Sequence, residues 1–253
     1  MGADRIELSH QNLLAALGDQ WPPEQVDAAI ELLASSEGKF PSGVRKLPSD
    51  LVRAIQRERL LSAMLMATSE LGYRRANVQD VIDRAGVSRP TFYEHFGNKE
   101  DCFLAAFDSS ARRLRDQVDA AADEGSSWRE QVRFGMRAVL DFASAEPDTV
   151  RTVVVEARAA SAEAVLRRVE LLDHFSVCLD SRARAMLPAA ARFTEVTAAG
   201  VVGGIEALLY ARLCKSQFDQ LEGLYPSMMY FAVLSYEGHA AASEELALHS
   251  ASA

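Results

Sequence analysis

The sequence predicts an all-α protein in which a small three-helix head precedes a larger bundle of helices. From Leu51 onward, apolar residues recur at helical spacing and no stretch alternates as a strand would. In residues 77–96, two short helical segments are joined by a glycine-containing turn, which is typical of a helix-turn-helix. The longer segments that follow are separated by short polar connections, as expected for a helical bundle.

The composition allows a full core, and the charge is unevenly distributed. The chain has 253 residues, 49% of them hydrophobic, and a net charge of −9. Residues 1–43 hold two basic and seven acidic residues, whereas residues 44–101 hold ten basic and eight acidic residues. Charges act mainly within a Debye length of about 8–10 Å, so this middle section can attract phosphates although the whole chain is acidic.

Membrane and metal-binding classes find little support in the sequence. The longest apolar stretch, Ala198–Ala211, is interrupted by Glu206 and is shorter than the ~20 residues that span a bilayer. The N-terminus lacks the pattern of a secretion signal, so we expect a cytoplasmic protein without a membrane partner. Cys102, Cys178 and Cys214 are far apart and lack metal-ligand spacing, which predicts three buried thiols, no metal site and no cofactor.

Residues 1–46 are predicted to be a helical extension followed by a basic linker. Pro22–Gly38 has the spacing of a short amphipathic helix, and the prolines and glycine that follow predict a linker. The linker bases allow two interpretations, an arm that enters a DNA minor groove or a solvated tether. These bases are Lys39, Arg45 and Lys46.

The helices of the predicted head have their own start and stop signals. Ser49 is expected to cap a first helix that ends at Gly72. Asn77 is expected to cap a second helix, and Gly86, which tolerates left-handed backbone, follows its end. Ser88 is expected to cap a third, very short helix.

That third helix runs from about Arg89 to His95. Pro90 costs little in a first helical turn, where backbone N–H groups lack partners in any case. Gly97 is expected to end the third helix, and Asn98 to cap a fourth that continues to about Glu124.

The third helix is predicted to have one buried and one exposed face. Phe92 and Phe96 are four residues apart and would anchor it to the first two helices. The exposed flanks would then present donor side chains to phosphates or base edges. Those side chains belong to Arg89, Thr91, Tyr93 and His95, with Arg89 the candidate for a bidentate contact to guanine.

Lys99 stands where helix electrostatics disfavours a cation. In the first turn of the fourth helix, a positive charge opposes the helix dipole by about 0.3–1 kcal/mol. A lysine beside exposed N–H groups would, however, suit the binding of a phosphate, since both attract an anion. The alternative is that these side chains are ordinary surface residues around a two-phenylalanine core.

The stretch Val78–Asp108 resembles the DNA-binding signature of the tetracycline-repressor (TetR) family of bacterial regulators. The matching pieces are the turn "AGVS", the run "TFYEHFGNKE" and an apolar continuation, and the resemblance covers residues 53–108. It implies a homodimer that binds an inverted-repeat operator in double-stranded DNA. The implied DNA-contacting positions are Gln79, Ser88, Arg89, Pro90, Thr91, Tyr93 and His95, with Lys99 as a phosphate clamp. The sequence departs from the family in its N-terminal extension, because the family's first helix normally begins near the chain start.

The bundle is predicted from periodicity and from helix start signals. Helices are expected after Ser127, after Pro147, and over residues 163–186, 193–215 and 218–238, with Pro226 kinking or restarting the last. The predicted domains are the extension and linker 1–46, the DNA-binding head 47–97, the ligand-binding and dimerisation bundle 98–245, and a tail 246–253.

The last two predicted helices carry more glycine and apolar surface than a single buried face needs. Glycine inside a helix costs about 1 kcal/mol relative to alanine, so several glycines suggest a close approach of another backbone. In the TetR family these helices form the dimer interface, although simple burial within one subunit remains the alternative. The interface candidates are Gly200, Gly203, Gly204, Met228, Met229 and Val233.

The sequence indicates the residues of a ligand pocket less clearly than those of the head. Candidates on probable inner helices are Phe134, Phe142, His174, Phe175, Cys178, Glu206 and Tyr210. Glu206 could contact a ligand, or it could form an ion pair with Arg158 or Arg212, since buried charges are usually paired. The many apolar residues favour a small hydrophobic effector.

The resulting functional prediction is a ligand-responsive repressor, bound to DNA as a dimer and released by its effector. A different class remains open, a helical interaction protein whose main partner is another protein docked on the N-terminal extension. An enzyme is not expected, because the sequence lacks a nucleophile elbow, a phosphate-binding loop and metal-ligand spacing.

Overall fold

The computed structural model describes residues 17, 21–22, 24–27, 48–188, 193–194 and 196–250. Within these residues every regular element is a helix and no strand is present, which confirms the all-α prediction. Two compact units are formed, a head of residues 1–106 and a bundle of residues 107–253. The chain passes from one to the other inside helix α6 (Lys99–Asp123).

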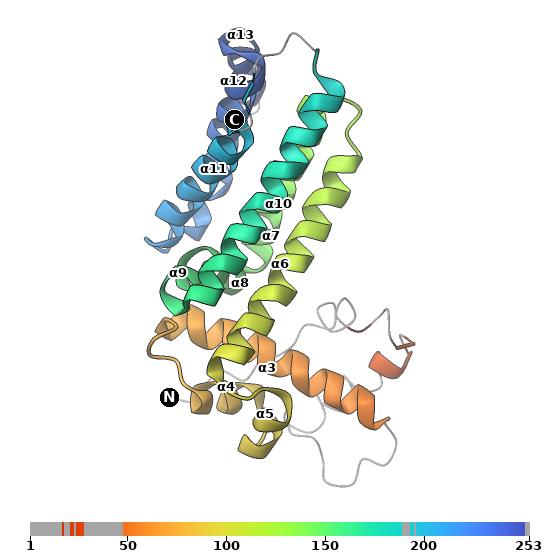
Figure 1. Ribbon diagram of the computed structural model, residues 1–253, viewed down its shortest axis with the longest axis vertical. Coiled ribbons are helices and arrows are strands. Elements are labelled where there is room, and N and C mark those ends of the chain that lie inside the picture. Colours follow the sequence, from red (N-terminus) through yellow and green to blue (C-terminus); the bar gives the residue numbers. More distant parts are fainter. Residues whose placement is uncertain are drawn as a thin grey trace. The chain divides into compact units, whose positions relative to one another are not determined.

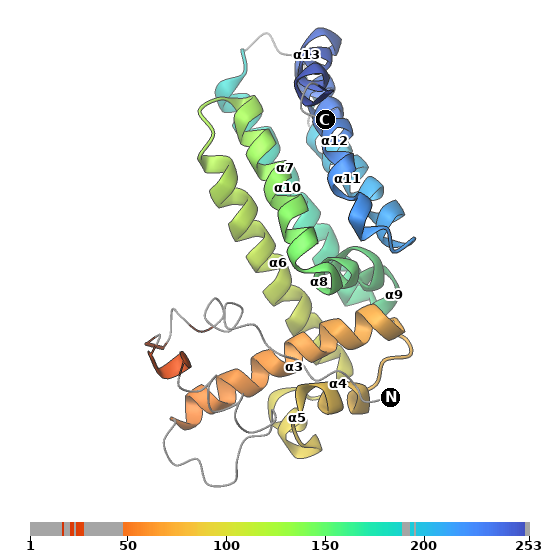
Figure 2. The same cartoon turned by 180° about the vertical axis from the view of Figure 1, so that it is seen from behind.

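The head contains α3 (Ser49–Leu71), α4 (Val78–Ala85) and α5 (Arg89–His95), with α4 and α5 packed beside α3 (Figures 1 and 2). Its core is formed by apolar side chains from all three helices and from the start of α6. The largest fully buried ones are Leu51, Ile55, Leu60, Met64, Phe92 and Phe103.

The ends of α3 agree only partly with the predicted signals. Ser49 is the first helical residue rather than the cap, because Pro48 occupies the cap position and makes no side-chain capping bond. The expectation that Ser49 caps this helix is therefore wrong. Gly72 ends the helix as predicted, with a positive φ of 78° and its amide donating to the Thr68 carbonyl oxygen over 2.9 Å.

The bundle is built from long helices joined by short turns (Figure 2). Its elements are α7 (Trp128–Ala145), α8 (Pro147–Arg151), the π-helical turn η1 (Thr152–Glu156), α9 (Ala157–Ala160), α10 (Ala162–Met186), α11 (Thr197–Leu213), the 3₁₀ turns η2 (Phe218–Gln220) and η3 (Glu222–Leu224), α12 (Tyr225–Glu237) and α13 (His239–Ser250). α11 packs on both α10 and α12, and α12 packs on α7 and α13.

The C-terminal elements refine the prediction. Pro226 lies in the first turn of α12, after two 3₁₀ turns. Of the two predicted effects of this proline, a kink or a restart of the helix, the structure shows the restart. Gly238 ends α12 with a φ of 86°. The following helix α13 was not predicted, and its backbone covers residues 246–250 of the segment expected to be a tail.

Three of the predicted dimer-interface residues belong to the core of the bundle instead. The side chains of Met228, Met229 and Val233 are completely buried within this single chain. A side chain without exposed surface cannot contact a second subunit. Their assignment to a dimer seam is therefore wrong, and the alternative of burial within one subunit holds for these three.

The cysteines do not share one environment. Cys102 is buried, as expected, and burial raises the pKa of its thiol well above the usual range. Cys178 is half-buried and Cys214 is exposed, so the prediction of three buried thiols is wrong for these two. Among the residues described, no helix is long and apolar enough to cross a membrane.

The predicted N-terminal arm, with Lys39, Arg45 and Lys46, lies outside the described residues, as does most of Pro22–Gly38. Of the described residues in this part of the chain, Leu17 and Val26 are buried.

Candidate nucleic-acid interface and bundle cavity

The turn between α4 and α5 is fixed by local hydrogen bonds. Asn77 caps α4 in a reciprocal capping box, in which its side chain accepts from the Gln79 and Asp80 amides while the Asp80 carboxylate accepts from the Asn77 amide. Gly86 then adopts the left-handed conformation, with φ 63° and ψ 32°. The amides of Gly86 and Val87 both donate to the Ile82 carbonyl oxygen, so the chain reverses within two residues.

The short helix α5 is capped and anchored as predicted. The Ser88 hydroxyl accepts a hydrogen bond from the Thr91 amide over 3.2 Å. Phe92 and Phe96 are buried, with ring centroids 5.9 Å apart. This anchor turns the opposite face of the seven-residue helix to solvent.

Residues at the starts of α4 and α5 contribute to one exposed surface. Arg89 Nη2 donates to Gln79 Oε1 over 3.1 Å, and Gln79 Nε2 donates to Asp83 Oδ1 over 2.7 Å. Tyr93, one turn after Arg89, is 49% exposed. Guanidinium, amide and phenol groups thus share one solvent-facing surface, which suits hydrogen bonding to base edges and phosphates.

The other flank of α5 differs from the prediction. Thr91 is half-buried, and its hydroxyl lies 2.8 Å from the Ser88 hydroxyl. His95 is also half-buried, its Nε2 is enclosed without a hydrogen-bond partner, and burial followed by the charges of Arg53 and Arg57 lowers its pKa. The expectation that these two side chains are exposed donors is therefore wrong.

Lys99 lies in the first turn of α6, where Asn98 accepts a hydrogen bond from the Asp101 amide as a cap. Its Nζ does not stand free for a phosphate, because it donates to the Tyr73 and Ala76 carbonyl oxygens over 2.8 and 2.9 Å. It also lies 4.1 Å from the centroid of the Tyr73 ring, and burial lowers its pKa. The geometry gives this lysine a structural role in the head.

Two arginines on α3 were not predicted as part of this surface. Arg53 and Arg57 are exposed and four residues apart, so they share one face of α3. Arg53 Nη2 donates to the Glu94 carbonyl oxygen over 3.3 Å, and the Arg57 guanidinium lies 5.7 Å from the Phe96 ring. Both therefore flank the end of α5, and their spacing was the sequence signal that could have identified them.

The bundle encloses a cavity of about 170 Å³. Its lining comes from α6, α7, η1, α10, α11 and α12, and is almost entirely apolar. Leu114, Val118, Leu171 and Phe175 are among the lining side chains, while Arg168, Arg182, Asp119 and Gln131 supply polar groups. An apolar cavity with a few polar side chains is the usual form of a small-molecule site.

Glu206 lines this cavity, and its carboxylate forms ion pairs with two arginines. Its carboxylate accepts from Arg158 Nη2 over 2.5 and 2.6 Å, and Arg168 Nη2 lies 2.7 Å from it. The ion pair with Arg158 that the sequence suggested is confirmed, whereas Arg212 instead donates to Gln217 and Gln220. The three side chains together carry one net positive charge, and two of them, Arg168 and Glu206, line the cavity.

The predicted pocket residues divide into two groups. Phe175, Cys178 and Glu206 line the cavity. The other four are not among its lining residues: Phe134, Phe142, His174 and Tyr210. Phe134 is 40% exposed, and Phe142 is buried in the core. The Cζ atom of Arg158 lies 4.0 Å from the centroid of the Tyr210 ring. Helical spacing alone could not separate a cavity wall from the core beside it.

Residues 60–106 match the family model described as bacterial regulatory proteins, tetR family. The transcriptional activator FasR of Mycolicibacterium smegmatis is 32% identical over 104 residues, which are 41% of this chain and 48% of FasR. The regulator BetI of Stenotrophomonas maltophilia is 31% identical over 88 residues, 34% of this chain and 45% of BetI. The chain thus spans about half the length of the curated relatives it matches.

Solved structures extend the similarity of fold to the bundle. The fatty acid degradation regulator FadR from Bacillus halodurans has a TM-score of 0.59 and 18% identity, covering 68% of this chain and 97% of its own. FadR from Bacillus subtilis, solved in complex with stearoyl-CoA, has a TM-score of 0.59 and 17% identity, covering 72% and 98%. The all-helical architecture of such regulators is therefore shared by this chain.

Proposed function

We propose that this protein, whose residues 60–106 match the tetR family of bacterial regulatory proteins, is a transcriptional regulator that binds an operator as a dimer. The observation that carries the proposal is the exposed face of α5, a helix anchored by buried phenylalanines. Arg89 and Tyr93 lie on this face, and Arg89 donates to Gln79 of α4. In a helix-turn-helix, the second helix of the pair enters the major groove and its first residues contact base edges.

Within this proposal, the residues of the head have distinct tasks. Arg89 and Gln79 read base edges, and the exposed residues Ser88, Pro90 and Tyr93 lie at or near the start of α5. Arg53 and Arg57 bring positive charge to the end of that helix and contact phosphates. Phosphate contacts fix the orientation of the protein on the duplex, while base contacts supply the sequence preference.

The dimer seam is proposed on the face of α11 and α12 that this chain leaves open. An added Cβ at Gly200 or Gly203 would meet nothing within 4 Å, so a second backbone has room to approach. Gly204 differs, because the Phe231 ring already covers it. Exposed apolar side chains continue this face, namely Leu208 and Phe231 at 37% exposure and Leu234 at 36%. A twofold seam matches an inverted-repeat operator.

The effector is proposed to be an amphipathic small molecule with an apolar part. The apolar cavity would bury the chain of such a molecule, and the positive charge of the Arg158–Arg168–Glu206 group would attract an acidic end. Fatty-acyl compounds have this chemistry, and a neighbour in fold was solved with stearoyl-CoA. An effector alters DNA affinity only if it binds one conformation more tightly than the other.

Selection from genomic DNA tests the proposal. The purified chain is incubated with sheared DNA of its source, and the retained fragments are sequenced, with Arg89→Ala as the matched control. The proposal predicts enriched fragments that share an inverted repeat, and weaker enrichment for the variant. A promoter–reporter assay on those fragments then tests the predicted repressor role against activation, the role for which FasR is named. Retention without any shared sequence would contradict the proposal.

A further inference from the structure

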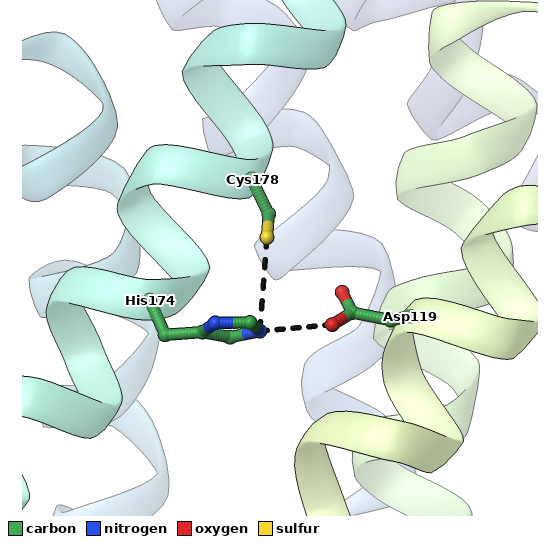
Figure 3. A group of neighbouring side chains, drawn as sticks. All are labelled: Asp119, His174 and Cys178. Carbon is green, nitrogen blue, oxygen red and sulfur yellow. Dashed lines mark hydrogen bonds and ion pairs between the residues drawn. The ribbon is translucent and has the colours of Figure 1, made fainter.

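Asp119, His174 and Cys178 form a cluster of three different metal-ligating side chains in the bundle. Asp119 extends from α6, while His174 and Cys178 lie one turn apart on α10 and point toward it (Figure 3). One ligand atom of each residue, namely a carboxylate oxygen, a ring nitrogen and Sγ, lies within 4.8 Å of the other two. No spacing in the sequence signals this group, because Asp119 is 55 residues from His174.

The geometry around His174 separates two chemical interpretations of the cluster. A nucleophilic Cys–His–Asp arrangement requires the thiol and the carboxylate to bond to different ring nitrogens. Here both contact Nε2: Asp119 Oδ2 at 2.9 Å and Cys178 Sγ at 3.7 Å. Because the thiol and the carboxylate contact the same ring nitrogen, no proton can pass between them through the imidazole. The Oδ2, Sγ and Nε2 atoms instead surround a point that a cation can occupy.

The separation of Cys178 Sγ and His174 Nε2 is close to that of two ligand atoms in a tetrahedral zinc site. Zinc bonds of about 2.3 Å to sulfur and 2.0–2.1 Å to nitrogen place the two ligand atoms about 3.6 Å apart at a tetrahedral angle. The observed Sγ–Nε2 distance of 3.7 Å agrees with this geometry. The 2.9 Å hydrogen bond between Nε2 and Oδ2 would open by about half an ångström when an ion replaces the shared proton.

The surroundings of the cluster balance the charge of a divalent ion. Arg182 Nη1 lies 3.5 Å from the other oxygen of Asp119, and its Nη2 lies 2.6 Å from Asp123 Oδ1. Arg182 therefore orients the Asp119 carboxylate, and Asp123 offsets its positive charge. With the Cys178 thiolate, these four groups carry two net negative charges. The Asp119 and His174 side chains are each 30% exposed, which leaves a path for an ion.

We propose that Asp119, His174 and Cys178 bind one divalent cation of the zinc class, with a fourth coordination position open to water or a ligand. A nitrogen, a sulfur and an oxygen donor suit Zn²⁺ and Co²⁺ better than Mg²⁺ or Ca²⁺, which prefer oxygen alone. Binding replaces the proton of the Cys178 thiol with the metal, and that proton passes to solvent. Asp119 and Cys178 also line the bundle cavity, so a bound ion and a cavity ligand would share two side chains.

Cobalt titration of the chelator-treated chain tests the site without any use of DNA. The wild type is expected to bind one Co²⁺ per chain, with the visible bands of a tetrahedral site and a thiolate charge-transfer band that Zn²⁺ removes. Cys214→Ser is the matched control, since Cys214 is exposed and outside the cluster, and it should keep the band. Cys178→Ser should lose it, and His174→Gln should weaken binding at least about tenfold.

The test does not depend on the folding of the cluster variants. In Cys214→Ser, the remaining thiols are Cys178 and the fully buried Cys102, so a cobalt–thiolate band in that protein points to Cys178. Circular dichroism checks the helicity of each variant. The proposal is overturned if the wild type shows no thiolate band, if the band disappears in Cys214→Ser, or if a folded Cys178→Ser retains it.

Discussion

The Lys99 ammonium donates a hydrogen bond to the Tyr73 carbonyl oxygen over 2.8 Å and lies 4.1 Å from the centroid of the same residue's ring. It also donates to the Ala76 carbonyl oxygen, so one side chain joins the start of α6 to the connection between α3 and α4. A cation that opposes the dipole of its own helix is thus offset by two carbonyl oxygens and an aromatic face.

Replacement of Lys99 should destabilise the head. Lys99→Met removes two charge-assisted hydrogen bonds and a cation–π contact, and we expect the free energy of unfolding to fall by about 1.5–3 kcal/mol. Urea denaturation followed by circular dichroism measures this change, with the exposed Lys215→Met as control. Unchanged stability together with a DNA-binding salt slope lowered by about one unit would instead support the phosphate-clamp role.

The stability of the head should fall in mild acid because of His95. Burial, and then the charges of Arg53 and Arg57, lower the pKa of His95 below its ordinary value of 6.5, against a smaller opposite effect of Glu94. The unfolded chain takes up a proton near pH 6.5, whereas the folded head does so only at lower pH. This stability is therefore complete above pH 6.5 and is lost as the pH falls toward the folded-state pKa.

Denaturation of the wild type and His95→Gln at pH 7.5 and 5.5 isolates that contribution. The wild type should lose more free energy of unfolding than the variant between these pH values. Other groups titrate in the same range, so the difference between the two proteins is the quantity that counts. Equal losses in both proteins would show that His95 has no such role.

Arg89 should control the base preference of the head. Arg89→Ala should relax preference at one base position by about 1–3 kcal/mol, since a bidentate arginine–guanine contact discriminates by that amount. Binding to duplexes substituted at each operator position measures the effect, and Arg112→Ala, an exposed arginine in the bundle, is the control. If Arg89→Ala instead weakened binding to every duplex equally, Arg89 would contact a phosphate rather than a base.

Gly203 should be required for the dimer but not for the fold of one chain. Gly203→Leu adds a side chain whose Cβ meets no other atom of this chain within 4 Å, so its own helix should form while a partner backbone is held off. We expect the dimer dissociation constant to rise at least about tenfold, the equivalent of 1.4 kcal/mol. Analytical ultracentrifugation checks this, with Gly223→Leu as control because that glycine also has open space. Equal dimer fractions in the two variants would place the seam elsewhere.

Glu206 should contribute strongly to the stability of the bundle. Glu206→Gln leaves Arg158 and Arg168 without their shared carboxylate, at a cost of about 1.5–3 kcal/mol. Glu163→Gln is a suitable control, because the pair of Glu163 with Arg167 is exposed and such pairs contribute about 0–1 kcal/mol. Thermal unfolding of both variants decides between a structural ion pair and a carboxylate that is free to serve a ligand.

The features of the head that the sequence predicted correctly depend on neighbours in the chain. Asn77 and Ser88 cap their helices through bonds to amides two or three residues away, and Gly86 is the residue best suited to left-handed backbone. Phe92 and Phe96 lie on one face because they are four residues apart. Each of these contacts joins residues a few positions apart, so their spacing in the sequence is enough to predict it.

The features that were missed depend on residues distant in the chain. The partners of the Lys99 ammonium are carbonyl groups 23 and 26 residues away, and no local pattern indicates them. The burial of Met228, Met229 and Val233 follows from packing of α12 against α7 and α13, and α13 itself was not predicted. Asp119 joins His174 and Cys178 only because α6 and α10 lie side by side.

We propose that this protein reads a DNA sequence through α5, and a pair of binding titrations tests that proposal. Fluorescence anisotropy measures the affinity of the wild-type chain for a selected operator and for a scrambled duplex of equal composition, at one salt concentration. We expect the wild-type chain to bind the operator at least about 10³-fold more tightly than the scrambled duplex, a ratio typical of specific regulators. Equal affinities for the two duplexes would contradict it.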